Sequence, residues 1–349
     1  MGDGEKTPLK LDFDSKVRLE FRGATITSDA GLLACRELDD ALSLTDSADD
    51  FLEESRPGEN ILHKLIPLLR QSIYSRLAGY DDTNDADRLS QDPAMRVVVG
   101  WKGPDRNAAS TSEMGRFETE WLTQKENLKG IERLNVEWIK RVVAKTVHRR
   151  IILDIDSSES PVHGRQEEAA YNGHFECVCY HPLFCFNQFG DLERALLREG
   201  HVHSADDWRG VLEPVIARYR DTKKRSFRGD AAFAKPELYE FLEAEGYRYA
   251  IRLPANDVLH EEISYLLMRP VGRPPKKPIV YFTCFEYRAA TWTKPRRVVA
   301  KVEWHRGELY PRVGFIVTNL TWWAGDVVII GDDIEENSET FTITITLLG

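Results

Sequence analysis

Apolar residues recur every three or four positions in two stretches of the first 150 residues. In residues 60–77 and again in residues 128–147, this spacing places the apolar side chains along one face of a helix. The sequence therefore predicts a mostly helical N-terminal region. Residues 80–93, between these two stretches, are rich in Asp and predict a polar loop.

From residue 151 onward, the apolar residues fall in short runs that are typical of β-strands. Residues 151–155 form a nearly continuous apolar run and predict a buried strand. Further strands are predicted at residues 175–186, 193–198, 224–228 and 247–253, with helices at 206–219 and 236–245. The predicted order of elements is therefore β-β-β-α-β-α-β, and residues 280–317 are β-like again.

Two aspartates, Asp156 and Asp230, lie near the ends of the first and the fourth of these strands. If the two strands are neighbours, the carboxylates meet at one edge of the sheet and repel each other unless a cation lies between them. Mg²⁺ prefers such oxygen ligands and keeps waters for a substrate. Aspartates at strand ends are also common as turn or capping residues, and the spacing alone favours that simpler interpretation.

The composition is that of an ordinary globular protein of 349 residues with a formal charge of −10. No apolar run is long enough for a membrane-spanning helix, and the polar N-terminus lacks the apolar segment of a signal peptide. The five cysteines are an odd and sparse count, which predicts a reduced, cytoplasmic chain.

Charge is distributed unevenly along the chain. Residues 29–59 carry a net charge of −8, residues 194–312 carry +7, and residues 321–349 carry −6 without a single Lys or Arg. Basic clusters in the middle region are suited to phosphates. For any single cluster, a solvated surface is the simpler interpretation.

Nine short segments carry a joint signal, namely residues 26–33, 78–85, 112–118, 153–158, 162–164, 170–174, 180–183, 228–233 and 315–320. Together they resemble the DDE-domain transposases of bacterial insertion sequences, in the group called transposase DDE domain group 1. The resemblance covers the chain from about residue 10 to about residue 320. Each segment alone is a weak signal, but the joint match is specific.

The resemblance implies an α/β fold with a ribonuclease-H-like mixed sheet, a helical N-terminal region and a β-rich insertion. Residues 1–150 would form the helical region that grips transposon ends, and residues 151–255 the catalytic core. The insertion would cover residues 256–311, the last core strand residues 312–320, and a divergent acidic tail residues 321–349.

The implied reaction is metal-dependent cleavage and transfer of DNA strands at inverted-repeat ends, with Mg²⁺ or Mn²⁺ as the cofactor. The first catalytic carboxylate maps to Asp156, with Asp154 as the alternative on the same face of the strand, and the second maps to Asp230. The family's third carboxylate is a Glu on a helix after the strand at residues 315–320, and no match to its pattern is present.

The tail after residue 320 departs from the family and resembles a frameshifted or rearranged end, with a divergent natural tail as the alternative. Its only glutamates are Glu335, Glu336 and Glu339, and none has an Arg four residues before it. Without a third carboxylate, we expect this chain to bind DNA at most. The alternatives are a non-catalytic DNA-binding remnant and a metal-dependent nuclease.

The partner implied by the resemblance is double-stranded DNA, both transposon ends and target, with a homodimer on DNA as an option and no membrane. The basic residues expected to contact this DNA are Arg225, Arg228, Arg273, Lys276, Lys277, Arg296 and Arg297. The segment around Arg273 is equally compatible with a minor-groove hook and a Pro-rich linker. Trp292 and Trp304 are equally suited to stacking on bases and to packing between strands.

Overall fold

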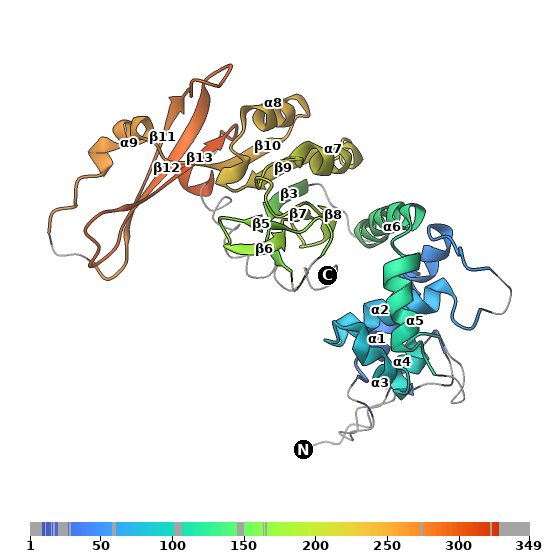
Figure 1. The fold of residues 1–349 in the computed structure, drawn as a ribbon. Helices are drawn as coiled ribbons and strands as arrows, with labels where there is room; N and C mark the ends of the chain where they lie inside the picture. The colour runs from blue at the N-terminus through green and yellow to red at the C-terminus, as the bar shows by residue number, and fades with distance from the viewer. Residues whose placement is uncertain are drawn as a thin grey trace. The chain divides into compact units, whose positions relative to one another are not determined.

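A computed structural model describes residues 9–327, apart from 11, 15, 17, 20–26, 28, 58–60, 101–106, 145–149, 163, 165, 273–274 and 322. The described residues divide into two compact units, the first covering those up to Ala144 and the second those from Arg150 onward. Figure 1 shows the elements of both units. No helix within the described ranges is long and apolar enough to cross a membrane.

The first unit is built from helices. They are α1 (Leu32–Leu42), α2 (Leu65–Leu77), α3 (Ala86–Leu89), α4 (Pro93–Val98), α5 (Thr111–Arg116) and α6 (Lys125–Ala144), with a short strand pair, β1 (Leu9–Lys10) and β2 (Arg18–Leu19). The two helices predicted from apolar spacing are confirmed as α2 and α6. They contribute to one buried cluster, in which Leu68 of α2 and Leu134 of α6 are almost fully enclosed.

The prediction of a loop at residues 80–93 is wrong, because this stretch contains α3 and the beginning of α4. Its aspartates cap helical turns: the Asp82 carboxylate accepts a hydrogen bond from the Asn84 N–H at 2.9 Å, and Asp92 accepts one from the Met95 N–H at 3.0 Å. Capping satisfies N–H groups that have no partner within the helix. Leu89 is then buried within the unit.

An eight-stranded mixed sheet forms the second unit, in the order β11-β12-β13-β10-β9-β3-β7-β8. Its strands are β3 (Arg150–Ser157), β7 (Leu183–Asn187), β8 (Leu192–Leu196), β9 (Lys224–Gly229), β10 (Arg248–Leu253), β11 (Ile279–Tyr287), β12 (Arg296–Trp304) and β13 (Arg312–Thr318). Strand β3 pairs antiparallel with β7 and parallel with β9, which pairs parallel with β10. This arrangement agrees with the ribonuclease-H-like sheet that the resemblance implies.

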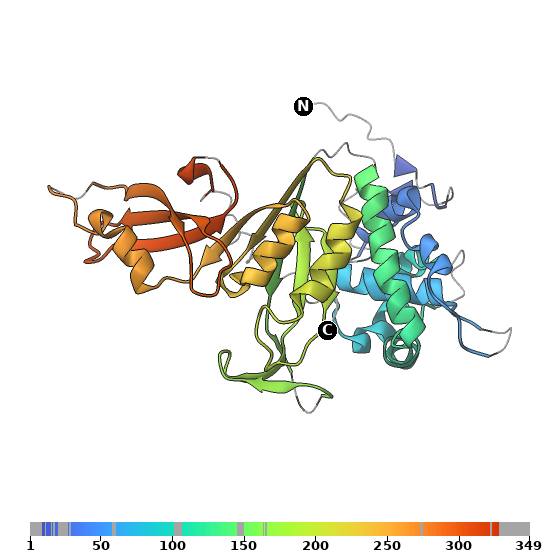
Figure 2. The ribbon, with the colours of Figure 1, turned by 90° about the horizontal axis from the view of Figure 1, so that it is seen from above.

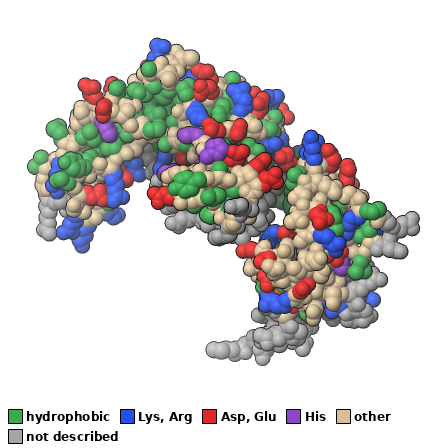
Figure 3. Space-filling view, in the orientation of Figure 1, with side chains coloured by type: hydrophobic (Ala, Val, Ile, Leu, Met, Phe, Trp, Pro, Cys, Tyr) green, Lys and Arg blue, Asp and Glu red, His purple; other side chains and the backbone are tan. Residues whose placement is uncertain are grey.

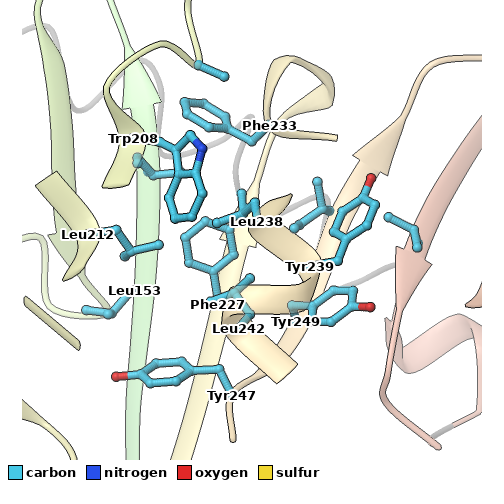
Figure 4. Close-up of a cluster of buried hydrophobic side chains, with 14 of the residues drawn as sticks. Leu153, Trp208, Leu212, Phe227, Phe233, Leu238, Tyr239, Leu242, Tyr247 and Tyr249 are labelled. Atoms are coloured by element: carbon cyan, nitrogen blue, oxygen red, sulfur yellow. The ribbon is translucent and has the colours of Figure 1, made fainter. Parts of the chain in front are cut away.

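Three helices cover one face of this sheet, namely α7 (Trp208–Arg218), α8 (Pro236–Ala244) and α9 (Asp257–Glu262), and Figure 2 shows α7 and α8 lying along it. Parallel neighbours require crossover connections, which α7 and α8 provide. The largest core cluster lies between these helices and the sheet. In Figure 4, Leu153 of β3 and Phe227 of β9 meet Trp208 and Leu238 of the helices. Burying each such side chain contributes about 1.5–3 kcal/mol to folding.

The single strand predicted at residues 175–186 is instead two strands in different sheets. Residues up to Tyr180 belong to β6 (Cys177–Tyr180), which pairs with β4 (Ser160–Pro161) and β5 (Ala170–Asn172) in a small second sheet. Strand β7 then starts at Leu183 in the large sheet. Pro182 lies between the two strands and has no N–H to donate to a ladder, which favours the break at this point.

The strands predicted at residues 280–317 continue the large sheet. Strand β12 pairs with β13 along seven residue pairs, and β13 pairs with β10. Both tryptophans of this region pack between elements, because only 4% of Trp292 and 7% of Trp304 are exposed. The Trp304 indole N–H also donates to the Leu266 carbonyl at 3.3 Å. The packing interpretation of these two residues is therefore confirmed.

Gly200 fixes the loop after β8 against the small sheet, and we predict that Gly200→Ala destabilises the protein. A Cβ at this position would lie 2.2 Å from the Cys179 carbonyl oxygen and 2.4 Å from that of Ala170, both backbone atoms. Overpacking of this kind costs about 1–3 kcal/mol. The matched control is Gly210→Ala in α7, where nothing lies within 4 Å and helix propensity favours Ala by about 1 kcal/mol. Thermal unfolding that ranks the two variants equally would contradict the prediction.

Candidate active site

The register of three parallel strands brings the predicted carboxylates together. Ile155 of β3 and Ile251 of β10 both pair with Gly229 of β9. Asp156, the next residue of β3, and Asp230, the residue directly after β9, therefore occupy one level of the sheet at the carboxyl ends of adjacent strands. Both side chains are partly exposed. Alternation along the strands places them on the face opposite the covering helices, since Leu153 and Ile155 face the helical core.

Asp154, the alternative to Asp156, is occupied by a buried ion pair. Its two carboxylate oxygens accept hydrogen bonds from Nε and Nη2 of Arg228, each at 2.5 Å. The two residues are register partners in β3 and β9, and both are buried. A forked pair of this kind holds both side chains in one geometry. Asp154 is therefore committed to Arg228, which leaves Asp156 as the better partner for Asp230.

The surroundings of Asp156 disfavour its charge. The pKa of this carboxyl is raised to about 6, with burial as the largest cause; the hydrogen bond from the Ser157 N–H acts against the rise, and the negative charges of Asp230 and Asp154 add to it. That N–H donates to Oδ1 at 2.8 Å. The repulsion from Asp230 agrees with the shared sheet level of the two carboxylates. A raised pKa with a specific charged neighbour is typical of a functional site.

Asp230 caps the turn that leads into α8. Its Oδ1 accepts a hydrogen bond from the Ala232 N–H at 3.0 Å. Burial raises the pKa of this carboxyl, whereas the backbone donors and the positive charges of Arg252 and His203 act in the opposite direction. The capping role that the sequence left open is therefore real, and it holds the carboxylate beside Asp156 at the same time.

These two carboxylates fit a divalent cation as hard oxygen ligands. Burial raises the pKa of both carboxyls, and the charge of Asp230 raises that of Asp156 further; a bound cation would offset both effects. Across the described ranges, no group of three or more His, Cys, Asp or Glu side chains is arranged to hold a metal ion. Glu335, Glu336 and Glu339, the tail's candidates for a third ligand, lie outside the described residues.

Two arginines that we expected to contact DNA have structural roles instead. Arg228 is the buried partner of Asp154. Arg296 is also buried, donates to Glu243 at 2.9 and 3.3 Å, and lies over the rings of Tyr239 and Trp292. Neither guanidinium is presented to a phosphate on the surface. This corrects both expectations. The sequence alone does not distinguish an arginine on the surface from one that is buried beside a carboxylate.

The remaining candidate DNA contacts differ in their exposure. Arg225 lies in the first half of β9, at the other end of that strand from Asp230, with its guanidinium over the Tyr247 ring. Arg297 is half-buried and donates to the Leu320 carbonyl at 2.6 Å. Lys276 and Lys277 are exposed, while Arg273 lies outside the described residues.

The exposed Lys276 and Lys277 are part of a basic tip of the large sheet. They lie just before Ile279, which pairs with Trp304, and the exposed Arg306 follows Trp304 closely. Figure 3 shows Lys and Arg side chains gathered at this end of the β11–β12 extension, at the lower left. The tip is the surface that best fits the expected phosphate contacts.

Sequence reasoning missed Arg252, which belongs to the same sheet level as the two aspartates. It follows Ile251, the partner of Gly229, and its charge lowers the pKa of Asp230. Nothing in the local sequence marks it, because its place depends on the parallel register of β9 and β10. Counting one residue beyond the paired positions on all three strands would have found it.

The Asp154–Arg228 pair gives a stability prediction. Arg228→Leu leaves Asp154 buried without its counter-charge, so we expect the free energy of unfolding to fall by about 3–5 kcal/mol. The double variant Asp154→Leu/Arg228→Leu removes both charges and should recover most of that loss. Urea unfolding of both single variants and the double variant measures the coupling. Additive losses would show that the two side chains do not act as a pair.

The chain is similar to a known protein family over most of its length. A family model described as transposase DDE domain group 1 matches residues 9–331, which is most of the chain. No curated protein matches the chain. The match includes both Asp156 and Asp230. The chain therefore belongs to the group 1 family of DDE-domain transposases, with their ribonuclease-H-like α/β fold.

Proposed function

We propose that this protein is an insertion-sequence transposase that binds inverted-repeat ends and has lost strand cleavage and transfer in its present form. Its family acts on DNA and generally uses divalent metal ions. The observation that carries the proposal is the level of the sheet shared by Asp156 and Asp230, inside the matched region. The raised pKa of Asp156 supports a role for this pair beyond capping.

Asp156 and Asp230 would hold the divalent cation, Mg²⁺ or Mn²⁺. When bound, the metal supplies electrostatic stabilisation of the charge that develops at a phosphate during strand cleavage. The Asp154–Arg228 pair keeps β3 and β9 in register directly beneath the two ligands. Burial of this pair and of Ile155 keeps water from one side of the site.

The DNA partner would be contacted by exposed cations. Lys276 and Lys277 at the basic tip, together with Arg297, are the candidates in the second unit. The helical first unit, which overlaps our expected region 1–150, would contribute to gripping transposon ends. We further propose a cytoplasmic location and, on DNA, a homodimer, both by analogy with the family.

The proposed loss of strand cleavage rests on the third carboxylate, which has no counterpart at this site among the described residues. Two carboxylates leave a second metal under-coordinated, and phosphoryl transfer then lacks part of its charge clamp. The described residues provide no third acidic ligand beside Asp156 and Asp230. A metal-dependent nuclease without transposition is the weaker alternative, because it requires the same third carboxylate.

Binding without cleavage is the direct test. We expect the purified chain to bind a duplex of the terminal repeat that flanks its coding sequence, with an affinity that falls steeply as salt rises. Each phosphate contact contributes a slope of about −0.9 in a plot of log K against log salt. Lys276→Gln/Lys277→Gln should flatten this slope by roughly two contacts. Fluorescence anisotropy at several salt concentrations provides the measurement, and affinity insensitive to salt would refute phosphate binding.

Cleavage of the same duplex in Mn²⁺ would contradict the proposed loss of activity. If cleavage occurs and is abolished by Glu335→Gln, Glu336→Gln or Glu339→Gln, the tail supplies the missing ligand. Cleavage that survives all three substitutions but not Asp156→Asn would place the ligand elsewhere in the chain.

The raised pKa of Asp156 predicts how its removal changes stability with pH. Its pKa is about 6 in the folded chain and near 3.8 in the unfolded chain, so the unfolded state releases its proton first as pH rises. This carboxyl therefore destabilises the metal-free fold increasingly between pH 4 and 6 and fully above that range. We expect Asp156→Asn to raise the free energy of unfolding at pH 8 by up to about 3 kcal/mol.

Divalent metal should reverse the order of stability of the wild type and Asp156→Asn. A ligand that binds only the folded state stabilises it by mass action, so Mn²⁺ should raise the urea midpoint of the wild type more than that of Asp156→Asn. Asp221→Asn, which changes an exposed aspartate of the same unit, is the control and should behave like the wild type. Equal responses of all three proteins to Mn²⁺ would exclude Asp156 as a ligand.

A further inference from the structure

Arg252 faces the two aspartates from the third parallel strand. Ile251 of β10 pairs with Gly229 of β9, so Arg252 is level with Asp230, and Asp230 is level with Asp156. The side chain of Ala250, two residues earlier, packs on the face away from α7 and α8. Alternation therefore places Arg252 on that same face, with the two carboxylates.

The side chain of Arg252 is partly exposed, unlike that of Arg228, which is buried. On its other side, Arg252 pairs with Ile316 of β13, whose side chain is apolar. The order across the sheet at this level is therefore carboxylate, carboxylate, guanidinium and apolar side chain.

The charges at this end of β3, β9 and β10 favour a cation. At the level of Asp156 and the level of Asp154, these three strands carry three carboxylates and two guanidiniums on this face, and Asp154 is already neutralised by Arg228. In the metal-free protein, Arg252 offsets part of the charge of Asp230. With a divalent cation on Asp156 and Asp230, the face becomes net positive, and the guanidinium is then suited to an anion rather than to Asp230.

We propose that Arg252 binds a non-bridging oxygen of the DNA phosphate that is presented to Asp156 and Asp230. This inference rests on the proposed DNA-end function of the same site. Guanidinium groups match phosphate oxygens with paired donors, a geometry that an ammonium group does not reproduce. Arg252 is thus a phosphate-binding residue that orients the scissile linkage beside the carboxylates.

The test compares two duplexes that differ in one linkage. Both carry the terminal repeat that flanks the coding sequence; one has a natural phosphate at the repeat boundary, and the other a neutral methylphosphonate there. Affinity of the full-length chain is measured in Ca²⁺ by fluorescence anisotropy. We expect the wild type to bind the phosphate duplex about tenfold more tightly, as for a charge-assisted contact. Equal binding of the two duplexes by the wild type would overturn the proposal.

Arg252→Gln should lower affinity for the phosphate duplex by about tenfold and leave affinity for the methylphosphonate duplex unchanged. Arg252→Lys keeps the charge without the fork, so it should bind the phosphate duplex with intermediate affinity. The matched control is Arg248→Gln, an exposed arginine on the same face near the other end of β10, which should bind like the wild type. An equal loss on both duplexes, or none, would overturn the role of Arg252.

Failure of the proposed function gives a different result. A wild type that does not prefer the terminal repeat over a scrambled duplex would refute end binding and, with it, this inference. If the wild type prefers the terminal repeat, and Arg252→Gln binds the phosphate and the methylphosphonate duplexes as tightly as the wild type does, only the role of Arg252 is refuted. Circular dichroism of each variant checks folding, and if Arg252→Gln is misfolded, Arg252→Lys and the wild-type comparison of the two duplexes decide.

Discussion

The parallel pairing of β3, β9 and β10 is the constraint on which the rest of the second unit depends. Parallel neighbours cannot be joined by a tight turn, so the chain must leave the sheet and return through α7 and α8. These helices need apolar partners, which is why Leu153 and Phe227 face them from the strands. Charged side chains can therefore lie on the opposite face of the sheet, which these helices do not cover. One register thus decides both the core and the acidic site.

Charge on that second face is tolerated in two different ways. Asp154 and Arg228 neutralise each other within the sheet, and their desolvation is offset by a forked hydrogen bond. One level further along, Asp156 and Asp230 repel each other and have raised pKa values. A folded protein keeps such repulsion only where something else compensates for it, and a divalent cation is the compensation that fits two adjacent carboxylates.

The elements that could be predicted from the sequence are those with a local pattern of apolar residues. The apolar run at residues 151–155 predicts β3, and helical spacing predicts α2, α6, α7 and α8. Aspartates misled us at residues 80–93, because Asp82 and Asp92 cap helices and the sequence alone does not distinguish a cap from a loop. Arg228 and Arg296 were misjudged because burial arises from tertiary packing. No local pattern marks Arg252, because the pairing of β10 with β9 is what places it near Asp230.

The global charge of −10 places the positive surface of this protein under a strong constraint. Two arginines of its basic region, Arg228 and Arg296, form ion pairs with carboxylates inside the protein. Fewer cations therefore face solvent than the number of Lys and Arg residues suggests. A duplex that approaches Asp156 and Asp230 without metal meets like charge. With metal bound, the same face attracts phosphate, and Arg252 adds to that attraction. Metal and DNA should therefore bind cooperatively at this sheet edge, because each offsets the charge that opposes the other.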